Sequence, residues 1–302
     1  MTHFQDWAYC IATSLLLVIA LFGGSACAQT TPEVEPPLVL GLDHIPVAVA
    51  DLDRAAEQYR KLGFTLKPGQ AHENGIRNQH IKFPDGTEIE LISASEARDP
   101  LTAEYLRHLV RGDGAAFVGF YAPDMDQLTD RLEAEGKTYD DDGGLISFPE
   151  SDELRYIFFG HRLRSTTDQP HHFKHPTGAA ALIGVWIAAD DLTQERRLLT
   201  ALGAMTAEEE VYTPQKSKAT VARLQHAELL LLPGSRQLTP GRRIVGATIR
   251  TRDLDALRRV LSESSQNVPQ VVARNDGRSI FIPPGDAHGI WLEFRQEVTN
   301  DP

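Results

Sequence analysis

Cysteine is nearly missing from this chain of 302 residues, because both cysteines, Cys10 and Cys27, lie within the first 28 residues. The remaining residues contain no thiol, which excludes disulfides, cysteine ligands and cysteine nucleophiles from that part of the chain. Basic charge is also scarce, since 30 Lys and Arg face 42 Asp and Glu and give a net charge of −12. A chain without a basic surface is not expected to bind nucleic acid.

Several catalytic signatures are absent as well. The sequence has no complete Gly-x-x-x-x-Gly-Lys-Ser/Thr phosphate loop, since Gly136-Lys137-Thr138 follows Arg131 where the first glycine would be, and it has no Gly-x-Ser-x-Gly elbow and no His-Glu-x-x-His helix. Phosphate-loop nucleotide hydrolases, serine hydrolases of the elbow type and zinc peptidases of the His-Glu type are therefore not expected. The net negative charge by itself does not indicate a substrate.

Near the start of the chain, residues 11–22 form an apolar run that is too short for a comfortable membrane span. Small residues follow it, and Ala26-Cys27-Ala28 offers a cleavage site before Gln29. We interpret residues 1–28 as a secretory signal peptide, which predicts a periplasmic or secreted protein with no membrane span after cleavage. Two alternatives stay open, an uncleaved anchor and a lipoprotein lipidated at Cys27. Residues 29–37 form a polar, proline-rich tether.

One pattern occurs four times along the rest of the chain. Each copy is an alternating strand that ends in an aspartate and leads into a helix, and the aspartates are Asp51, Asp124, Asp191 and Asp253. Their separations are 73, 67 and 62 residues, and glycine follows twelve residues later in the first three copies. In the fourth copy three strands are expected after the helix, at 270–274, 279–283 and 289–296. The sequence thus predicts four βαβββ modules.

The first copy carries the most informative side chains. In the strand from residue 44, His44 points away from the face that carries Ile45 and Val47. A helix follows over residues 53–63, and in the segment Glu88-Ile-Glu-Leu-Ile the carboxylate of Glu90 also lies opposite the apolar face. An imidazole and a carboxylate are therefore expected on the uncovered face of one small sheet.

These residues resemble a known family. Leu42-Asp-His-Ile-Pro-Val-Ala-Val-Ala-Asp-Leu, Leu62-Gly-Phe and Glu88-Ile-Glu-Leu-Ile are similar to the glyoxalase-like branch of the vicinal oxygen chelate superfamily, and so are His175-Pro-Thr-Gly-Ala and Ala287-His-Gly-Ile-Trp-Leu-Glu-Phe. The resemblance covers about residues 38–296. It implies an α+β fold in which four βαβββ modules form two glyoxalase-like domains with curved mixed sheets and helices outside. With a polar segment at 164–178 as the linker, the domains are residues 38–163 and 179–297.

The resemblance leaves the activity open, because the superfamily contains lyases, isomerases, dioxygenases and metal-free binding proteins. Our first hypothesis is an exported enzyme of the lyase, isomerase or dioxygenase type that acts on a small oxygen-rich molecule in a concave cleft. The alternative is a metal-free protein that binds or sequesters a small molecule. A third reading is a degenerate copy kept for interaction with another envelope protein. The sequence does not fix the oligomeric state.

In metal-binding members of the superfamily, ligands come from the first and last strands of two paired modules. By this resemblance His44 and Glu90 are ligands of one divalent metal, Mn, Fe, Ni or Zn, and Glu90 is also a general base. The counterparts of His44 in the other copies, counted back from the aspartates, are Phe117, Gly184 and Gly246, none of which ligates a metal. The last-strand carboxylate recurs in the third and fourth copies as Glu228 and Glu293.

Two protein ligands hold a divalent ion poorly unless a loop supplies a third, for which His72, His80 and His161 are candidates. Another reading of His44 is a polar side chain that is hydrogen-bonded inside the cleft. The segment His72-Glu-Asn-Gly-Ile-Arg-Asn78 resembles a loop near the cleft in this branch, which implies that His72 and Asn78 bind substrate, although a surface turn explains Asn74-Gly75 equally well. Phe117 and Tyr121 are expected to form an aromatic wall of the cleft. On the strands of the second domain, Trp186, Thr248 and Arg250 either line a second pocket with an anion-binding arginine or are ordinary exposed residues.

Overall fold

The computed structural model of the protein describes residues 37–162, 164–264, 268–274 and 276–297. The predicted signal peptide lies outside the described residues, as does the predicted tether apart from residue 37. Within the described part, no helix combines the length and the apolar character that a membrane span needs. The contacts keep these residues in one compact unit, so the predicted division into two domains at 164–178 stays a prediction.

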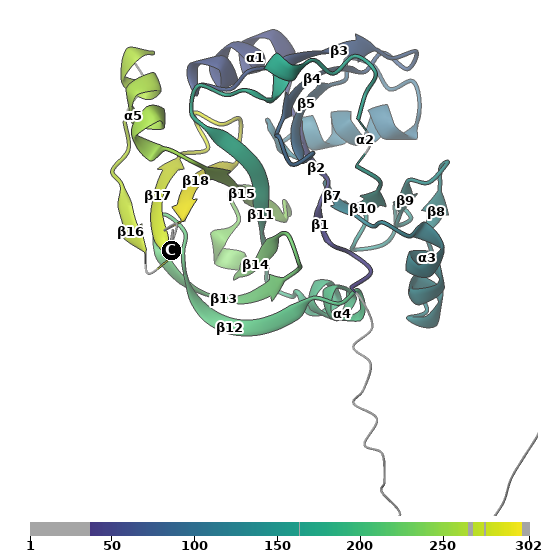
Figure 1. Ribbon diagram of the computed structural model, residues 1–302. Coiled ribbons are helices and arrows are strands. Elements are labelled where there is room, and N and C mark those ends of the chain that lie inside the picture. The colour runs from purple at the N-terminus through teal and green to yellow at the C-terminus, as the bar shows by residue number, and fades with distance from the viewer. Residues whose placement is uncertain (1–36, 163, 265–267, 275, 298–302) are drawn as a thin grey trace, which may run out of the picture. The chain divides into compact units, whose positions relative to one another are not determined.

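The four predicted βαβββ modules are all present (Figure 1). The first consists of β2 (His44–Ala48), α1 (Leu52–Lys61), β3 (Lys67–Ala71), β4 (Arg77–Lys82) and β5 (Glu88–Ser93). The second consists of β7 (Val118–Tyr121), α3 (Met125–Ala134), β8 (Asp140–Asp141), β9 (Ile146–Ser147) and β10 (Ile157–Gly160). The third consists of β11 (Ala179–Ala189), α4 (Thr193–Ala201), β12 (Met205–Tyr212), β13 (Lys216–Arg223) and β14 (Glu228–Pro233). The fourth consists of β15 (Ile244–Thr251), α5 (Leu254–Glu263), β16 (Val272–Arg274), β17 (Gly277–Ile282) and β18 (Trp291–Glu297).

Short additional elements connect the modules. They are β1 (Gly41–Leu42), α2 (Pro100–Leu109), β6 (Gly114–Ala115) and two 3-10 turns at Pro170–Phe173 and Gly234–Arg236. The segment 164–178 is held against the first module, because Nδ1 of His175 accepts a hydrogen bond from the backbone of Thr65 and its Nε2 donates to the carbonyl of Lys82.

The recurring aspartate starts the helices. The side chains of Asp51, Asp124 and Asp253 each accept hydrogen bonds from backbone N–H groups in the first turn. These N–H groups have no partner within the helix, so a carboxylate there stabilises the helix start. Asp191 lies one residue further out and caps the same turn through the backbone of Thr193.

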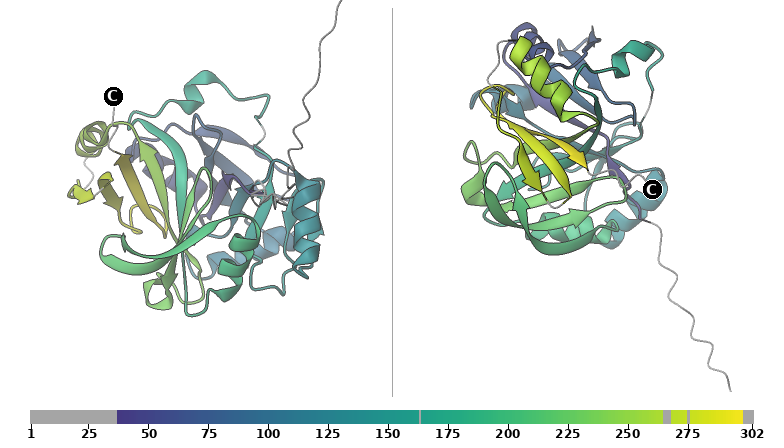
Figure 2. Two further views of the ribbon diagram at one scale, coloured as in Figure 1. Left: turned by 60° about the horizontal axis from the view of Figure 1, so that its bottom comes forward. Right: turned by 60° about the vertical axis from the view of Figure 1, so that its left-hand side comes forward.

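The sheets show how the modules pair. Modules three and four form one eight-stranded sheet in the order β12-β13-β14-β11-β15-β18-β17-β16, which curves strongly in Figures 1 and 2. Modules one and two form two five-stranded sheets, β3-β4-β5-β2-β6 and β1-β7-β10-β9-β8. In the second module pair, the first strands β11 and β15 pair antiparallel and join the two modules into one sheet. In the first module pair, the corresponding strands β2 and β7 pair instead with the short strands β6 and β1, so the sheet is divided into two at this place.

The core has three parts. One large apolar cluster contains buried side chains of all four module helices, such as Leu52, Leu128, Leu198 and Leu257, together with the strands beneath them. Two smaller clusters belong to other faces of the sheets, one around Phe117 and Phe158 and one around Trp186 and Leu230. The two module pairs therefore share their outer core and differ in their interiors.

Candidate functional site

His44 and Glu90 meet at the concave side of the first module pair. They lie on neighbouring parallel strands, β2 and β5, where Glu90 pairs with Pro46, two residues after His44. Nε2 of His44 is 3.6 Å from Oε2 of Glu90, and their side chains are 23% and 12% exposed. The sequence predicted that these two residues share one face, and the strand pairing brings them into an ion pair.

Asp43 sets the charge of His44. Its Oδ2 atom accepts a hydrogen bond of 2.7 Å from Nδ1 of the imidazole. Burial alone lowers the pKa of His44, but the hydrogen bond and charge of Asp43 and the charges of Glu90 and Glu88 raise the pKa to about 9. At neutral pH His44 is thus an imidazolium that carries a proton on both nitrogens, with Nδ1 donating to Asp43 and Nε2 facing Glu90.

Asn78 orients the carboxylate. Its Nδ2 donates a 2.6 Å hydrogen bond to Oε1 of Glu90 and lies 3.3 Å from Nε2 of His72. One oxygen of Glu90 is thereby fixed by Asn78, and the other faces His44. The structure therefore joins four predicted site residues, His72, Asn78, Glu90 and His44, in one chain of polar contacts.

This polar chain borders a cavity of about 310 Å³, which we call the His44 cavity. Its walls are mostly apolar, and the ring of His44 packs edge-on against Phe158 with 5.0 Å between centroids. The lining residues are His44, Pro46, His72, Asn74, Ile76, Glu90, Ile92, Leu101, Tyr105, Phe117, Asp142, Leu145, Ser147, Arg155 and Phe158. A cavity of this size fits a small organic molecule.

The wall of the His44 cavity that α2 forms was not predicted from the sequence. Leu101 and Tyr105 come from α2, which lies outside the repeated pattern. A local signal for this helix exists, because Asp99 and Thr102 form a capping box around Pro100. The predicted wall residue Phe117 lines the cavity, whereas Tyr121 does not and instead packs under the guanidinium of Arg162 at 4.9 Å.

A polar cavity of about 340 Å³ lies on the other side of His44 and His72. It is lined by His80, Glu88 and His161 among others, and Nδ1 of His80 is 2.5 Å from Glu88. His44 thus separates an apolar space from a polar one.

The donor set does not fit a resident divalent metal. At the four strand positions that would face one ion, the chain has His44 and Glu90 but also the phenyl rings of Phe117 and Phe158. Of the three candidate histidines, His72 contacts Asn78, His80 lies on β4 and contacts Glu88, and His161 lines the polar cavity. In the described ranges, no three His, Cys, Asp or Glu side chains gather as a metal site would require. We therefore derive no step through a metal.

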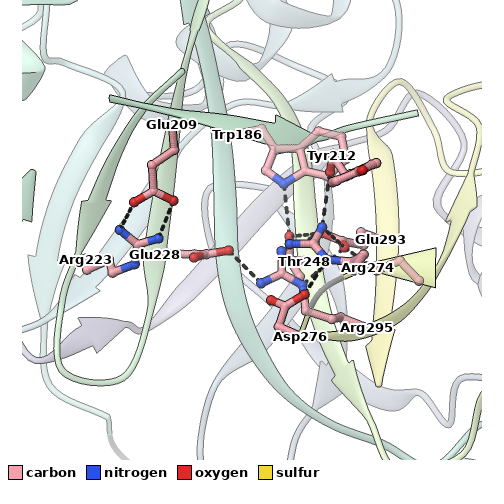
Figure 3. A network of polar contacts seen from close by, with 11 residues as sticks. Trp186, Glu209, Tyr212, Arg223, Glu228, Thr248, Arg274, Asp276, Glu293 and Arg295 are labelled. Carbon is pink, nitrogen blue, oxygen red and sulfur yellow. Dashed lines mark hydrogen bonds and ion pairs between the residues drawn. The ribbon is translucent and has the colours of Figure 1, made fainter. Parts of the chain in front are cut away.

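The interior of the second module pair is filled by a polar network (Figure 3). Glu293, which is 0% exposed, accepts hydrogen bonds from Thr248, Ser279, Arg274 and Arg295. These interactions fix Glu293 between two guanidinium groups and two hydroxyl groups.

Other side chains close the network. Arg295 also donates a 2.7 Å bond to Glu228, and these charges raise its pKa above the usual range despite burial. The indole of Trp186 donates to Thr248, and both residues are buried. The interpretation of Trp186 and Thr248 as ordinary exposed residues is therefore wrong, and their side chains contact the buried network instead of lining a second pocket. Arg250 is exposed and borders a separate cavity of about 530 Å³.

The strand pairing also corrects one predicted equivalence. Glu293 pairs with Thr248, two residues after Gly246, so it is the counterpart of Glu90. Glu228 pairs with Gly184 and is therefore the counterpart of Glu88, whereas Leu230 occupies the Glu90 position. A shift of two residues keeps a side chain on the same face of a strand, so alternation alone did not reveal the difference.

Solved structures with a similar fold support this architecture. A hypothetical protein from Staphylococcus aureus aligns with a TM-score of 0.58 and 15% identity over 85% of this chain and 100% of its own. A variant of 4-hydroxymandelate synthase from Streptomyces coelicolor aligns with a TM-score of 0.62 and 13% identity over 87% of this chain and 93% of its own. Catechol 2,3-dioxygenase aligns with a TM-score of 0.58 and 14% identity over 86% of this chain and 88% of its own.

A comparison with curated proteins finds no match. The family described as the glyoxalase-like domain matches residues 42–203, which is more than half of the chain. The match contains the first module pair with His44 and Glu90, and it continues through β11 and α4 of the third module. With the four modules and the paired curved sheets, this match shows that the chain belongs to the glyoxalase-like domain family of the vicinal oxygen chelate superfamily.

Proposed function

We propose that this protein is an enzyme that moves a proton on a small molecule bound in the His44 cavity. The substrate would have an aromatic or apolar body and a carbonyl group. The observation that supports this most is the position of the His44 and Glu90 ion pair, which lies at the edge of an otherwise apolar cavity. An imidazolium and a carboxylate in that position are an acid and a base within reach of one bound molecule.

In the proposed reaction, the Nε2 proton of His44 goes to the carbonyl oxygen while Oε2 of Glu90 takes a proton from the neighbouring carbon. The electron pair of the broken C–H bond forms the C=C bond of an enol, and the carbonyl π pair forms the new O–H bond. The O–H proton of the enol then returns to Nε2 of His44 as the C=O bond re-forms, and Glu90 gives its proton back to the carbon from which it came. Both side chains are restored, and delivery of the proton to the opposite face of that carbon inverts its configuration. These proton transfers involve no net oxidation or reduction, and the reaction belongs to the isomerase class.

The residues around the pair have supporting roles. Asp43 keeps His44 charged and fixes its ring, because it accepts from Nδ1. Asn78 holds Oε1 of Glu90, so that Oε2 is left to act as the base. Phe117 and Phe158 would pack against the substrate body and keep water away from the enol.

A second candidate is binding without turnover. The presence of Phe117 and Phe158 at two positions where the family resemblance implies ligands favours it. In that case His44 would only anchor an oxygen of the ligand.

Phenylpyruvate is a suitable probe, because it combines an aromatic ring with a carbonyl and an acidic C–H bond. Similar structures named for 4-hydroxymandelate and catechol support an aromatic probe. In deuterium oxide, NMR should show exchange of the C3 protons well above the uncatalysed rate. Glu90→Gln should lower that rate by about 100-fold with little change in binding, whereas Glu57→Gln on the exposed face of α1 should not. Saturable binding without exchange supports the second candidate, and the absence of both contradicts each proposal.

We also propose that the protein is exported, on the basis of residues 1–28. After expression in the native host, the N-terminal residue of the mature protein should be Gln29. A mature chain that begins with lipidated Cys27 would support the lipoprotein alternative, and a chain that retains Met1 would contradict cleavage.

A further inference from the structure

A cavity of about 360 Å³ lies beside the C-terminal half of α2, and we call it the arginine cavity. Five arginines line it, although the chain as a whole carries a net charge of −12. They are Arg107, Arg111, Arg155, Arg242 and Arg243. They come from α2 and the segment just after it, from the segment before β10 and from the segment before β15, so the folded chain gathers them from distant positions.

Three of these arginines already have carboxylate partners. Arg107 pairs with Glu150, Arg155 with Glu104, and Arg243 with Glu195 and, at 3.6 Å, with Glu153. Three of these carboxylates also line the cavity, namely Glu104, Glu150 and Glu153. The first pair is weak, because both side chains are more than half exposed. These pairs leave two cations of the arginine cavity to be explained.

Arg111 and Arg242 have backbone carbonyls as their partners among the described residues. Nη1 of Arg111 donates to the carbonyl of Pro240 at 2.9 Å. Arg242 donates to the carbonyls of His108, Gly112 and Asp113 at the end of α2. Carbonyl oxygens fix the two guanidinium groups in place, but they do not neutralise them.

Arg242 is also buried, with 6% of its surface exposed, and its Nε atom has no hydrogen-bond partner among the described residues. The charge of Asp113 acts on Arg242, but this carboxylate already accepts hydrogen bonds from Ala50 and His288. A buried charge with incomplete polar partners is costly, which makes an external anion a favourable partner. The neighbouring His108 responds to the same potential. Burial and the charges of Arg242 and Arg111 lower its pKa to about 4, against the opposing effects of the Gly114 backbone and Asp113.

We propose that the arginine cavity binds a small organic anion through a phosphate or carboxylate group held between Arg111 and Arg242. Arg111 uses one of its N–H donors on Pro240 and keeps the others for a ligand. Planar guanidinium groups bind both kinds of oxyanion with paired hydrogen bonds. The cavity volume leaves room for an organic group beyond the anionic head.

This site is separate from the His44 cavity but adjoins it. Arg155 lines both cavities, and α2 gives Tyr105 to one and His108 to the other. The proposal does not depend on the proposed proton transfer, because it concerns binding to a different set of side chains.

The test is an NMR titration of the full chain with labelled histidine side chains, with inorganic phosphate as the probe and sodium chloride at equal ionic strength as the reference. We expect a saturable shift of the His108 signals and a rise of its pKa by about one unit, because a bound anion offsets Arg111 and Arg242. Acetate replaces phosphate in a second arm, and the probe that saturates at the lower concentration identifies the preferred head group.

The variant Arg111→Gln should weaken the binding of the preferred probe by about tenfold or more. Arg54→Gln, which removes an exposed arginine of α1, is the matched control and should leave binding unchanged. Thermal unfolding of both variants verifies that they fold. Shifts that are equal in phosphate, acetate and chloride, or that persist in Arg111→Gln, would overturn the site. Proton exchange on phenylpyruvate is measured separately, so failure of one proposal does not imply failure of the other.

Discussion

The two module pairs place a carboxylate at the same strand position and surround it differently. In the first pair, Glu90 has an amide on one oxygen and an imidazolium beside the other, and a cavity opens in front of it. In the second pair, Glu293 is enclosed by two guanidinium groups and two hydroxyl groups. The fold fixes where the carboxylate lies, and the neighbouring side chains decide whether it is open to a ligand.

The contrast continues at the first-strand position. His44 occupies it in the first pair, whereas Gly184 and Gly246 occupy it in the second. The ring of Trp186 fills the space that the missing side chain of Gly246 leaves. A Cβ atom on Gly246 would lie only 2.5 Å from this ring. The second interior is therefore closed by packing as well as by charge.

The largest expected effect concerns stability in the second pair. Glu293→Gln leaves Arg274 and Arg295 buried without their shared counter-charge, so we expect a loss of about 3–5 kcal/mol in the free energy of unfolding. Urea denaturation measures it. The matched change Glu90→Gln should cost under about 1 kcal/mol, because the partners of Glu90 lie beside a cavity. Equal losses in the two variants would remove the proposed contrast.

The next effect tests the charge of His44. Because the folded pKa of about 9 lies above the unfolded value of 6.5, the stabilisation is complete below pH 6.5 and is lost as the pH rises through 9. Its size is about 3 kcal/mol. Unfolding free energies at pH 6 and pH 10 should therefore differ less in His44→Asn than in the unchanged protein. The exposed His226→Asn serves as the control, and a pH dependence unaffected by His44→Asn contradicts the charge assignment.

A smaller effect is expected from the residue that positions Glu90. Asn78→Ala removes the hydrogen bond to Oε1 and should lower proton exchange by about tenfold, or about 1.4 kcal/mol, mainly through the maximal rate. Steady-state exchange at several phenylpyruvate concentrations separates the maximal rate from the KM. A change confined to the KM would indicate that Asn78 contacts the substrate instead of holding the base.

The sequence predicted the parts of this comparison that depend on local rules. The aspartate before each helix and the alternation in β2 and β5 placed His44 and Glu90 on one face, and the structure confirms that they are neighbours. The different environment of Glu293 was not predicted, because Arg274 reaches it from a separate strand, β16. Such a contact depends on sheet curvature, which no short stretch of sequence encodes.

The structure differs from the sequence-based predictions at two other places, Tyr121 and α2, for similar reasons. Tyr121 lies on the same face of its strand as Phe117, because the two are four positions apart. It lies further along β7, however, beyond the end of the His44 cavity and against Arg162. The repeated pattern does not predict α2, because this helix lies outside the βαβββ modules and occurs after the first of them only. Parity and repetition therefore predict the face of a strand, but not the extent of a cavity along it.

The smallest expected effect is that of a chelator on the unchanged protein. Since the donor set around His44 and Glu90 has two ligands and two phenyl rings, dialysis against EDTA should change proton exchange by less than about twofold. The double variant Phe117→His and Phe158→Glu would present four donors at the same strand positions. After incubation of this variant with Zn²⁺ and removal of free metal, elemental analysis should find about one zinc ion per chain. A stoichiometric ion in the unchanged protein, lost together with activity on chelation, would mean that a third ligand joins His44 and Glu90, and the first interior would then be a metal centre.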